Sequence, residues 1–338
     1  MSDNAFVHVR DLRVVFRRDG QTINAVNGVS FDVQKGEVMA LIGESGSGKS
    51  VTLRALMRLH PPGSSELSGT LQVGDDEVLT MSASQLRRYR GGRCAMIFQE
   101  PLLAFDPVYT VGQQIIEGLR RHEGLSRQAA RDRALEALRQ VRIPSPERRL
   151  DAYPHEMSGG MRQRVMIALA LIGAPKLLIA DEPTTALDVV VQREILKELR
   201  EIVKSESMSM LLVTHDLHLA RDVADRVSVM YAGYILETGP VPRVLPNPAH
   251  PYTEGLLDAM PDMESEKGTL QPIKGEIPPP DKLGHGCPFA GRCPLTRVQC
   301  RMTLPAMQPV EEGWQSRCME AQCHAAQLDE AFKAQEQK

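Results

Sequence analysis

The chain has 338 residues and a formal net charge of −3, and 42% of its residues are hydrophobic. That composition is typical of a folded protein with room for one large domain and an appendage, or for two modest domains. The near-neutral charge gives no reason to expect nucleic acid or an anionic membrane surface as a partner. No apolar run reaches the roughly 18 residues that a membrane-spanning helix needs. The opening residues also lack the apolar core of a signal peptide, so we expect a cytoplasmic protein.

The first 40 residues are predicted to form short β-strands. "HVRDLRVVF" and "VNGVSFDV" alternate apolar and polar residues, which is typical of strands with one buried face. "EVMALIG" is a continuous apolar run, as expected for a strand that is buried on both faces of a sheet. A helix is predicted over residues 50–59, and it ends at Pro61-Pro62.

Helices and buried strands alternate through the middle of the chain. The pattern from Pro101 to Ile143 is mostly helical. "KLLIADEP" and "SMLLVTHD" are two further buried strands, and "VQREILKELREIV" is the helix between them. This alternation predicts a largely parallel α/β core. The sequence becomes rich in proline and glycine near Pro240, so we predict a division into residues 1–245 and 246–338.

A glycine-rich motif follows the first continuous apolar strand. "GESGSGKS" matches the P-loop pattern G-x-x-x-x-G-K-[ST], in which backbone N–H groups surround phosphate oxygens. Lys49 would contact the β- and γ-phosphates, and the Ser50 hydroxyl would ligate Mg²⁺. A plain glycine-rich turn is the alternative, and the strand-then-helix context disfavours it. The predicted nucleotide-binding residues are Gly43, Glu44, Ser45, Gly46, Ser47, Gly48, Lys49, Ser50 and Val51.

Polar side chains also follow the ends of other predicted strands. Asp181 and Glu182 end such a strand at its carboxyl end, where ligands bind in open α/β sheets. Asp181 would hold the magnesium ion through water, and Glu182 would polarise the attacking water. Gln99 follows "CAMIF", and its amide could reach both the metal and that water. His215 follows "LLVT" and could lie near the γ-phosphate, although a histidine at a strand end is more often structural.

"SGGMR", residues 158–162, completes a set of motifs that resembles the nucleotide-binding subunits of ABC transporters, whose signature is usually written LSGGQ. The resemblance implies a P-loop NTPase (RecA-like) α/β core with an N-terminal antiparallel β subdomain, a helical signature subdomain and a small cysteine-containing C-terminal extension. It also implies ATP and Mg²⁺ as ligands, with the metal held through Ser50, Gln99 and Asp181. A plain glycine-containing helix start is the alternative, and the order and spacing of the motifs disfavour it.

The same resemblance gives the signature residues a role in a second copy of the site. Ser158, Gly159 and Gly160 would contact the γ-phosphate of ATP bound to the opposing subunit. A helix N-terminus suits that role because its N–H groups and its dipole favour an anion. Met161 occupies the position at which the signature usually has glutamine, which is a departure from the family pattern.

Further roles come from the resemblance alone. Phe16 would stack on adenine, although an aromatic residue in a strand is more often simply packed. Gln99 matches the loop that senses the membrane subunits, and His215 matches the switch histidine. Asp188 matches the D-loop that couples the two subunits, or it caps the following helix. Residues 101–164 match the helical subdomain that docks on the membrane partner. The predicted catalytic residues are Glu182, His215 and Gln99.

A narrower resemblance covers nearly the whole chain. "YPHEMSGGMRQRVMIALAL" and "NPAHPYTEGLLDAMP" are similar to segments of the ATPases of bacterial dipeptide and oligopeptide importers. That family implies a peripheral protein on the cytoplasmic face of the bacterial inner (cytoplasmic) membrane, which couples ATP hydrolysis to peptide uptake. Its implied partners are a second ABC ATPase subunit, favoured as a paralogue, two transmembrane permease subunits and an extracytoplasmic peptide-binding protein.

One alternative stays open at this point, and two are disfavoured. An importer of nickel, glutathione or another small cargo uses the same ATPase design, because other proteins choose the cargo. A soluble ABC-type ATPase of DNA repair or translation is disfavoured. About 108 residues separate the P-loop from the signature without sustained heptads, and the chain has one P-loop. A non-catalytic regulatory partner is disfavoured because Glu182 and His215 are both present.

Five of the six cysteines lie in the C-terminal region. Zinc sites usually contain a pair with about two to four residues between the cysteines, and the four proposed ligands do not provide one. Four thiolates suit an iron–sulfur cluster, and the resemblance implies a structural [4Fe–4S] cluster here. Zinc and reduced thiols without a ligand are the alternatives. Cys323 is a spare or a substitute, and Cys94 is expected in the core. The predicted cluster ligands are Cys287, Cys293, Cys300 and Cys318.

Overall fold

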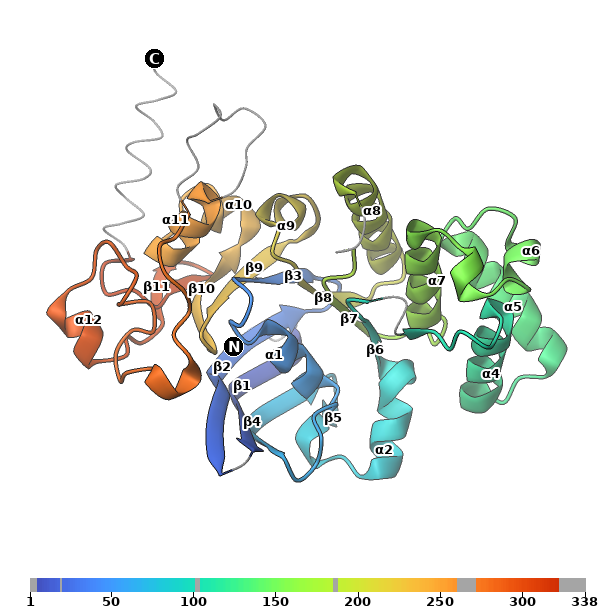
Figure 1. Cartoon of the computed structure of the whole chain (residues 1–338), viewed down its shortest axis with the longest axis horizontal. Helices are drawn as coiled ribbons and strands as arrows, with labels where there is room; N and C mark the ends of the chain where they lie inside the picture. Colours follow the sequence, from blue (N-terminus) through green and yellow to red (C-terminus); the bar gives the residue numbers. More distant parts are fainter. Residues whose placement is uncertain (1–4, 19, 101–103, 185–187, 260–271, 322–338) are drawn as a thin grey trace, which may run out of the picture. The chain divides into compact units, whose positions relative to one another are not determined.

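The structure is a computed structural model, and it describes residues 5–18, 20–100, 104–184, 188–259 and 272–321. It contains two compact units, each built from segments that are distant in sequence, and both combine strands with helices (Figure 1). The first unit comprises residues 1–7, 33–38 and 73–213, and the second comprises residues 8–32, 39–72 and 214–338. The division at residue 245 stays a prediction.

Three parallel strands form the centre of the first unit. They are β6 (Cys94–Ile97), β7 (Leu177–Asp181) and β8 (Ser209–Val213). β7 lies between the other two, with Ile97 opposite Ala180 on one side and Asp181 opposite Val213 on the other. Every residue of these strands is buried, which explains their continuous apolar sequences. The predicted parallel strands are therefore confirmed.

The main helices of the first unit begin at polar caps. α4 (Val111–Glu123), α5 (Arg127–Gln140) and α7 (Gly159–Leu171) each follow a residue whose hydroxyl accepts a backbone N–H, namely Thr110, Ser126 and Ser158. α5 packs against both α4 and α7, and together these helices form the green group of Figure 1. The other elements of the unit are β5 (Asp76–Glu77), η1 (Val78–Thr80), α2 (Ala83–Arg88), η2 (Tyr89–Arg93), α6 (Pro146–Leu150), η3 (Pro154–Glu156) and α8 (Val189–Ser205).

A sheet formed by the N-terminal strands lies mostly in the second unit. β2 (Gln21–Gln34), β1 (Ala5–Arg18) and β4 (Ser65–Val73) pair in that order. The two predicted N-terminal strands are present, and each is 14 residues long. In β1 the alternation of buried and exposed side chains shifts by one residue at Asp11, since Val7 and Val9 are buried before it and Leu12 and Val14 after it. Asp11 has a left-handed φ of 47° and donates its N–H to the Ser30 hydroxyl.

The second unit contains five further strands, and the C-terminal region contributes two of them. In order, the strands are β11 (Gln308–Glu311), β12 (Trp314–Ser316), β10 (Tyr234–Pro240), β9 (Arg226–Tyr231) and β3 (Val38–Ile42). β3 and β9 are parallel, and the other neighbours are antiparallel. No pattern in the sequence predicted that residues beyond 300 add strands next to β10. They do so because Trp314 is buried against Gly239, at which a Cβ atom would lie 2.8 Å from the indole.

The helices of the second unit are short. They are α1 (Lys49–Leu56), α9 (Leu217–Val223), α10 (Val241–Val244), α11 (Pro251–Asp258), η4 (Pro280–Lys282) and α12 (Val298–Met302). The predicted helix over residues 50–59 corresponds to α1, but it ends earlier, at Leu56, and Arg58 has a left-handed φ of 46°. Among all helices in the described ranges, none combines the length and the hydropathy that crossing a membrane requires.

A buried carboxylate joins the C-terminal strands and α11 to β10. One oxygen of Glu237 accepts hydrogen bonds from the Trp314 indole N–H at 2.8 Å and from the Ala249 N–H at 2.7 Å. The other accepts from the Thr253 hydroxyl at 2.5 Å and from the His250 N–H at 3.2 Å. Burial raises the pKa of Glu237 to about 7, and these four donors oppose the rise because they stabilise the charged form.

The stability of the second unit is therefore expected to fall as the pH rises. Because its folded-state pKa lies above its unfolded value, Glu237 contributes stability below about pH 4.5 that is lost as the pH rises through about 7. The contribution is on the order of 3 kcal/mol. Trp314 is the one tryptophan of the chain, so its fluorescence should titrate near pH 7. Glu237→Gln should abolish that transition while leaving His250 in place. A transition that persists in this variant would contradict the assignment.

Candidate functional site

The P-loop connects β3 to α1 in the second unit, as the motif requires. Gly43 and Gly48 have φ angles of 147° and 103°. Residues other than glycine rarely adopt φ angles in this region. A Cβ atom on Gly43 would lie 2.1 Å from the Met230 carbonyl oxygen, and one on Gly48 would lie 2.8 Å from the Ala25 carbonyl oxygen. Glycine is therefore required at both positions for two reasons: the backbone has a positive φ, and neighbouring backbone leaves no space for a Cβ atom.

The Lys49 ammonium lies inside this loop. Lys49 is 6% exposed, and its Nζ donates to the carbonyl oxygens of Gly43 and Glu44 at 2.8 Å each. It also lies 3.3 Å from the Ser47 hydroxyl. These are neutral acceptors, so phosphate oxygens would be stronger partners for the same ammonium. The loop thus presents one buried cation at the N-terminus of a helix, an arrangement that suits an anion.

Phe16 and His215 belong to the same unit as the P-loop. Phe16 is half-buried in β1, with its ring 5.3 Å from the His60 ring in an edge-to-face arrangement. Burial lowers the pKa of His60, so this ring is neutral near pH 7. His215 is exposed and precedes Asp216, whose carboxylate caps α9 by accepting the N–H groups of His218 and Leu219. The cap fixes the start of α9 and hence the backbone beside His215.

The carboxylates of the first unit lie at the carboxyl end of β7. Asp181 is 3% exposed. Glu182 follows it with a left-handed φ of 44°, and its N–H donates to the Val213 carbonyl oxygen at 3.0 Å. A non-glycine residue in this region stores strain, and such strain is concentrated at functional sites. The Gln99 amide donates to the Glu182 carboxylate at 3.1 Å. The structure therefore brings together two of the three predicted catalytic side chains.

The signature segment forms the N-terminus of α7. The Ser158 hydroxyl caps the helix by accepting the Met161 N–H at 3.3 Å, and Gly159 and Gly160 form its first two positions. A Cβ atom on Gly160 would meet only Val191, at 3.8 Å, which is an ordinary contact. The described part of the chain thus leaves room for a side chain at Gly160, and glycine here is not explained by packing within the chain.

Asp188 caps α8, because its carboxylate accepts the Val191 N–H at 3.0 Å. The alternative predicted for this residue is therefore present, and the D-loop role stays a prediction. The next two residues, Val189 and Val190, have exposed fractions of 69% and 77%. Two adjacent, exposed valines beside a helix cap are unusual for a surface that faces only water.

The C-terminal cysteines do not support the predicted iron–sulfur cluster. Burial raises the pKa values of Cys287 and Cys293 to about 11, and neighbouring thiols, including Cys300 and Cys318, add to the rise. Within the described ranges, no three His, Cys, Asp or Glu side chains form a group that could hold a metal ion. Cys323 lies outside those ranges. Cys94 is fully buried, as predicted, and burial raises its pKa to about 12.

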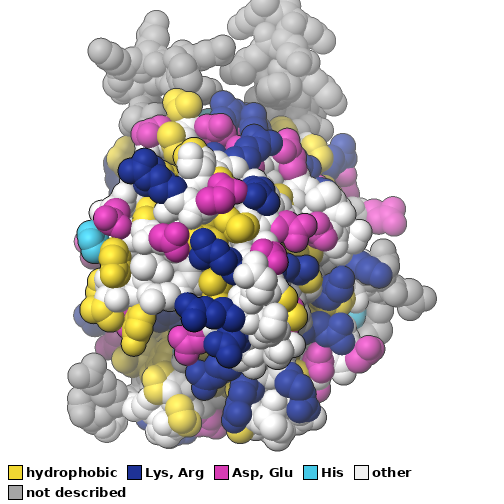
Figure 2. All heavy atoms as spheres, turned by 90° about the vertical axis from the view of Figure 1, so that its right-hand side faces the viewer, with side chains coloured by type: hydrophobic (Ala, Val, Ile, Leu, Met, Phe, Trp, Pro, Cys, Tyr) yellow, Lys and Arg dark blue, Asp and Glu magenta, His cyan; other side chains and the backbone are white. Residues whose placement is uncertain are grey.

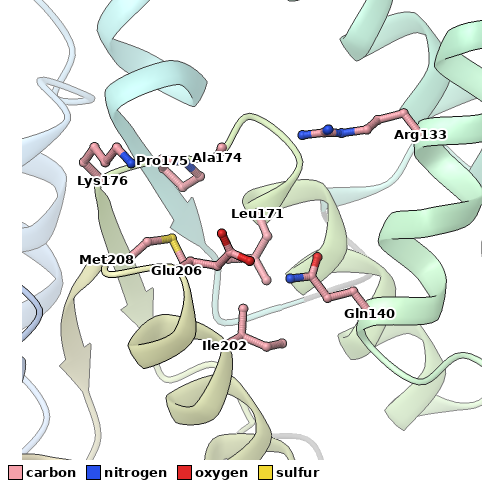
Figure 3. Close-up of a pocket in the computed structure, with 9 residues that line it drawn as sticks. All are labelled: Arg133, Gln140, Leu171, Ala174, Pro175, Lys176, Ile202, Glu206 and Met208. Atoms are coloured by element: carbon pink, nitrogen blue, oxygen red, sulfur yellow. The ribbon is translucent and has the colours of Figure 1, made fainter.

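A small cavity of about 100 Å³ lies at the amino ends of β7 and β8, whereas Asp181 lies at the carboxyl end of β7 (Figure 3). Lys176 and Met208 line it immediately before β7 and β8 begin, and Arg133 extends toward it from α5. Asp181, by contrast, ends β7. The cavity is consequently separate from the predicted catalytic group.

Two contacts to the P-loop were missed by the sequence analysis. The Tyr252 hydroxyl accepts the Glu44 N–H, and the Arg292 guanidinium pairs with the Glu44 carboxylate. Neither residue has a spacing or a motif that links it to the P-loop. The proline-rich segment before Tyr252 predicted only a separate C-terminal region, and Cys287 and Cys293, which flank Arg292, were predicted only as cluster ligands.

Three features together define the ATPase subunits of ABC transporters, and this chain has all of them. They are a P-loop between a strand and a helix, acidic residues at the end of a parallel strand, and a capped helix that begins with the sequence SGG. The ABC transporter family model matches residues 26–185, and the model of the oligopeptide/dipeptide transporter C-terminal region matches residues 236–300. The chain belongs to the family of peptide-import ATP-binding proteins of ABC transporters.

The relatives cover almost the whole chain. A putative peptide import ATP-binding protein of Brucella abortus (strain 2308) is 50% identical over 92% of this chain and 94% of its own length. The oligopeptide transport ATP-binding protein AppD of Bacillus subtilis (strain 168) is 43% identical, and the dipeptide transport ATP-binding protein DppD of Escherichia coli (strain K12) is 42% identical. Each covers 93% of this chain and 96% of its own length.

Solved structures share the fold. The ATP-binding cassette MJ0796, in a dimeric post-hydrolysis state bound to ADP and Pi, has a TM-score of 0.62 and 26% identity over 70% of this chain and 98% of its own. CbiO1 from Clostridium perfringens has a TM-score of 0.62 and 28% identity over 72% of this chain and 91% of its own. The predicted α/β P-loop NTPase fold is confirmed.

Proposed function

We propose that the chain is the ATPase subunit of an import complex that couples ATP binding and hydrolysis to uptake of dipeptides or oligopeptides. The observation that carries the cargo class is the match of residues 236–300 to the C-terminal region of oligopeptide and dipeptide transporter ATPases. The names of the relatives support the same class, since they are peptide, oligopeptide and dipeptide import proteins.

The nucleotide would be held by the P-loop residues, Gly43 to Val51, with Phe16 against the adenine. Lys49 supplies a buried cation that can exchange the carbonyl oxygens of Gly43 and Glu44 for phosphate oxygens. Ser50, Gln99 and Asp181 offer a hydroxyl, an amide and a carboxylate, and oxygen donors of these kinds suit Mg²⁺. The metal would neutralise charge on the phosphates when bound. Glu182 would accept a proton from the attacking water, with Gln99 orienting its carboxylate. His215 would contact the γ-phosphate.

The signature would serve a second copy of the site. Among the described residues only Val191 approaches the side-chain face of Gly160, at an ordinary contact distance, so an anion from outside the chain can approach the N–H groups at the start of α7. The exposed Val189 and Val190 beside Asp188 offer apolar surface for an opposing ATPase subunit. We infer that Ser158 to Met161 contact ATP held by that subunit, and that Asp188 lies in the interface. A paralogue is favoured as the opposing subunit by family resemblance.

The helical segment of residues 101–164 would dock on the membrane subunits. A groove of about 680 Å³ runs along α4. Tyr109, Gln113 and Ile116 line it together with one acidic residue, Glu117, and three basic ones, Arg120, Arg121 and Arg127. Figure 2 shows the numerous Lys and Arg side chains on this side of the molecule. A cationic groove with apolar walls fits an acidic, amphipathic segment of a permease. The chain would thus act at the cytoplasmic face of the inner membrane, beneath two permeases and with an extracytoplasmic peptide-binding protein.

Reconstitution of the complete transporter tests the cargo class. The chain, its partner ATPase, both permeases and the binding protein are placed in vesicles, and ATP hydrolysis is measured with defined ligands. Dipeptides or oligopeptides are expected to stimulate hydrolysis severalfold. Stimulation by nickel or by glutathione, and none by peptides, would replace the proposed cargo with one of those ligands.

The [4Fe–4S] cluster stays a prediction with a separate test. Neighbouring thiols raise the pKa values of Cys287 and Cys293, and soft thiolates suit iron–sulfur clusters or zinc. Anaerobically purified protein is therefore expected to contain about four iron atoms and acid-labile sulfide, with visible absorbance. Colourless protein that contains zinc, or no metal at all, would refute the cluster.

A further inference from the structure

The C-terminal region holds the P-loop at its second residue. Two nitrogens of the Arg292 guanidinium donate to the two carboxylate oxygens of Glu44, at 2.6 and 3.0 Å. This is the bidentate geometry in which arginine binds a carboxylate most strongly. The Glu44 backbone N–H also donates to the Tyr252 hydroxyl at 2.9 Å. Side chain and backbone of one P-loop residue are thus both fixed from outside the loop.

Arg292 is itself held rigidly. Its side chain is 7% exposed, and it donates to the carbonyl oxygens of Lys274 and Ile273 at 3.0 and 3.2 Å. The guanidinium carbon lies 5.7 Å from the centre of the Tyr231 ring, within cation–π distance. The guanidinium therefore has several fixed partners besides Glu44, and its position is defined by the C-terminal region rather than by the P-loop.

A packed aromatic cluster supports both contacts. Phe289 is 1% exposed, and its ring lies 5.4 Å from Tyr231 and 5.2 Å from Tyr252. Phe289 and Arg292 both lie between Cys287 and Cys293, and the N–H of Arg292 donates to the Phe289 carbonyl oxygen at 2.9 Å. This one loop therefore supplies the guanidinium that binds Glu44 and the ring that packs against the Tyr252 ring.

The contact reaches the phosphate-binding part of the P-loop directly. Lys49 donates to the carbonyl oxygen of Glu44 itself, the residue that Arg292 and Tyr252 fix. Rotation of the peptide group at Glu44 would move that acceptor and the neighbouring loop N–H groups together. Preorganised N–H groups bind phosphate more tightly, because less order must be imposed on binding.

We propose that Arg292 is a positioning residue for the P-loop, through which the loop between Cys287 and Cys293 sets the affinity for ATP. The proposal rests on the proposed function only in taking ATP as the ligand of the P-loop. It assigns a task in nucleotide binding to the C-terminal region, which lies more than 200 residues beyond the P-loop in sequence.

Equilibrium binding of ATP to the purified full-length chain tests the proposal. Arg292→Met is expected to weaken ATP binding about tenfold, since a charge-assisted, bidentate contact is lost. Arg292→Lys should recover part of the affinity, because it keeps the charge and loses the fork. The KM for ATP should rise while kcat at saturating ATP changes little. Arg297→Met is the matched control, since Arg297 pairs with Glu320 in the same region and its side chain is 63% exposed.

Glu44→Gln protects the test against a variant that fails to fold. It removes the carboxylate from the P-loop side and leaves the C-terminal loop unchanged, so it should weaken ATP binding as Arg292→Met does, and the double variant should be no worse than either. If the wild-type chain binds ATP and both Glu44→Gln and Arg292→Lys bind it equally well, the proposal is wrong and the proposed function stands. If the wild-type chain does not bind ATP, the proposed function fails first.

Discussion

Glu182→Gln is expected to reduce ATP hydrolysis by about 100- to 10,000-fold, the range that general base catalysis contributes, while ATP binding stays close to that of the wild type. The amide is almost the same size as the carboxylate, and its oxygen can still accept the Gln99 hydrogen bond. It cannot take a proton from the attacking water at neutral pH. ATP should therefore persist and hold two subunits together, so a dimer should accumulate with ATP and Mg²⁺.

The matched control is Glu206→Gln. Glu206 lines the cavity at the amino ends of β7 and β8, away from Glu182. Its replacement should therefore leave hydrolysis within about twofold of the wild type, as is usual for substitutions away from a site. Both rates are measured in the assembled complex at saturating ATP. If the Glu182 variant hydrolyses ATP at the wild-type rate, another group serves as the base.

Lys49→Ala is expected to weaken ATP binding by about 100-fold or more, because charge-assisted contacts to two phosphates are lost. The ammonium is buried and is bonded to two P-loop carbonyl oxygens, so the substitution also leaves those oxygens without this donor. Equilibrium binding and thermal unfolding of the nucleotide-free protein should be measured together. Loss of binding with a small change in the unfolding midpoint is the expected combination.

Lys197→Ala is the control for Lys49→Ala. Lys197 is exposed on α8 in the first unit, and its replacement should leave ATP binding unchanged. Lys49→Arg is expected to stay weak, because the larger guanidinium does not fit the space that the buried ammonium occupies. Wild-type affinity in Lys49→Ala would remove this residue from phosphate binding.

The local parts of the nucleotide site could be predicted from the sequence. The P-loop glycines, the strand that carries Asp181 and Glu182, and the serine cap of α7 each depend on residues close together in the chain. The contact between Gln99 and Glu182 could also be anticipated, since β6 and β7 are neighbouring parallel strands with both residues just beyond their carboxyl ends.

The support for the site from the C-terminal region could not be predicted. Glu44 and Arg292 are 248 positions apart in sequence, and no periodicity or motif spacing reports a contact of that range. Glu237 was similarly hidden, because a glutamate in a strand is ordinarily solvated and its four donors come from two separate segments, residues 249–253 and Trp314. The four C-terminal cysteines and the family resemblance predicted an iron–sulfur cluster, which stays a prediction; the described part of this region is held by hydrogen bonds and by strand pairing with β10.

The most direct test is the structure of the Glu182→Gln complex with ATP and Mg²⁺. The helix start at Ser158 and Gly160 should lie about 3 Å from the γ-phosphate of ATP that sits in the P-loop of the opposing subunit, a hydrogen-bond distance. The contradictory result is a compact, ATP-loaded pair in which these residues face solvent and every phosphate contact comes from a single chain.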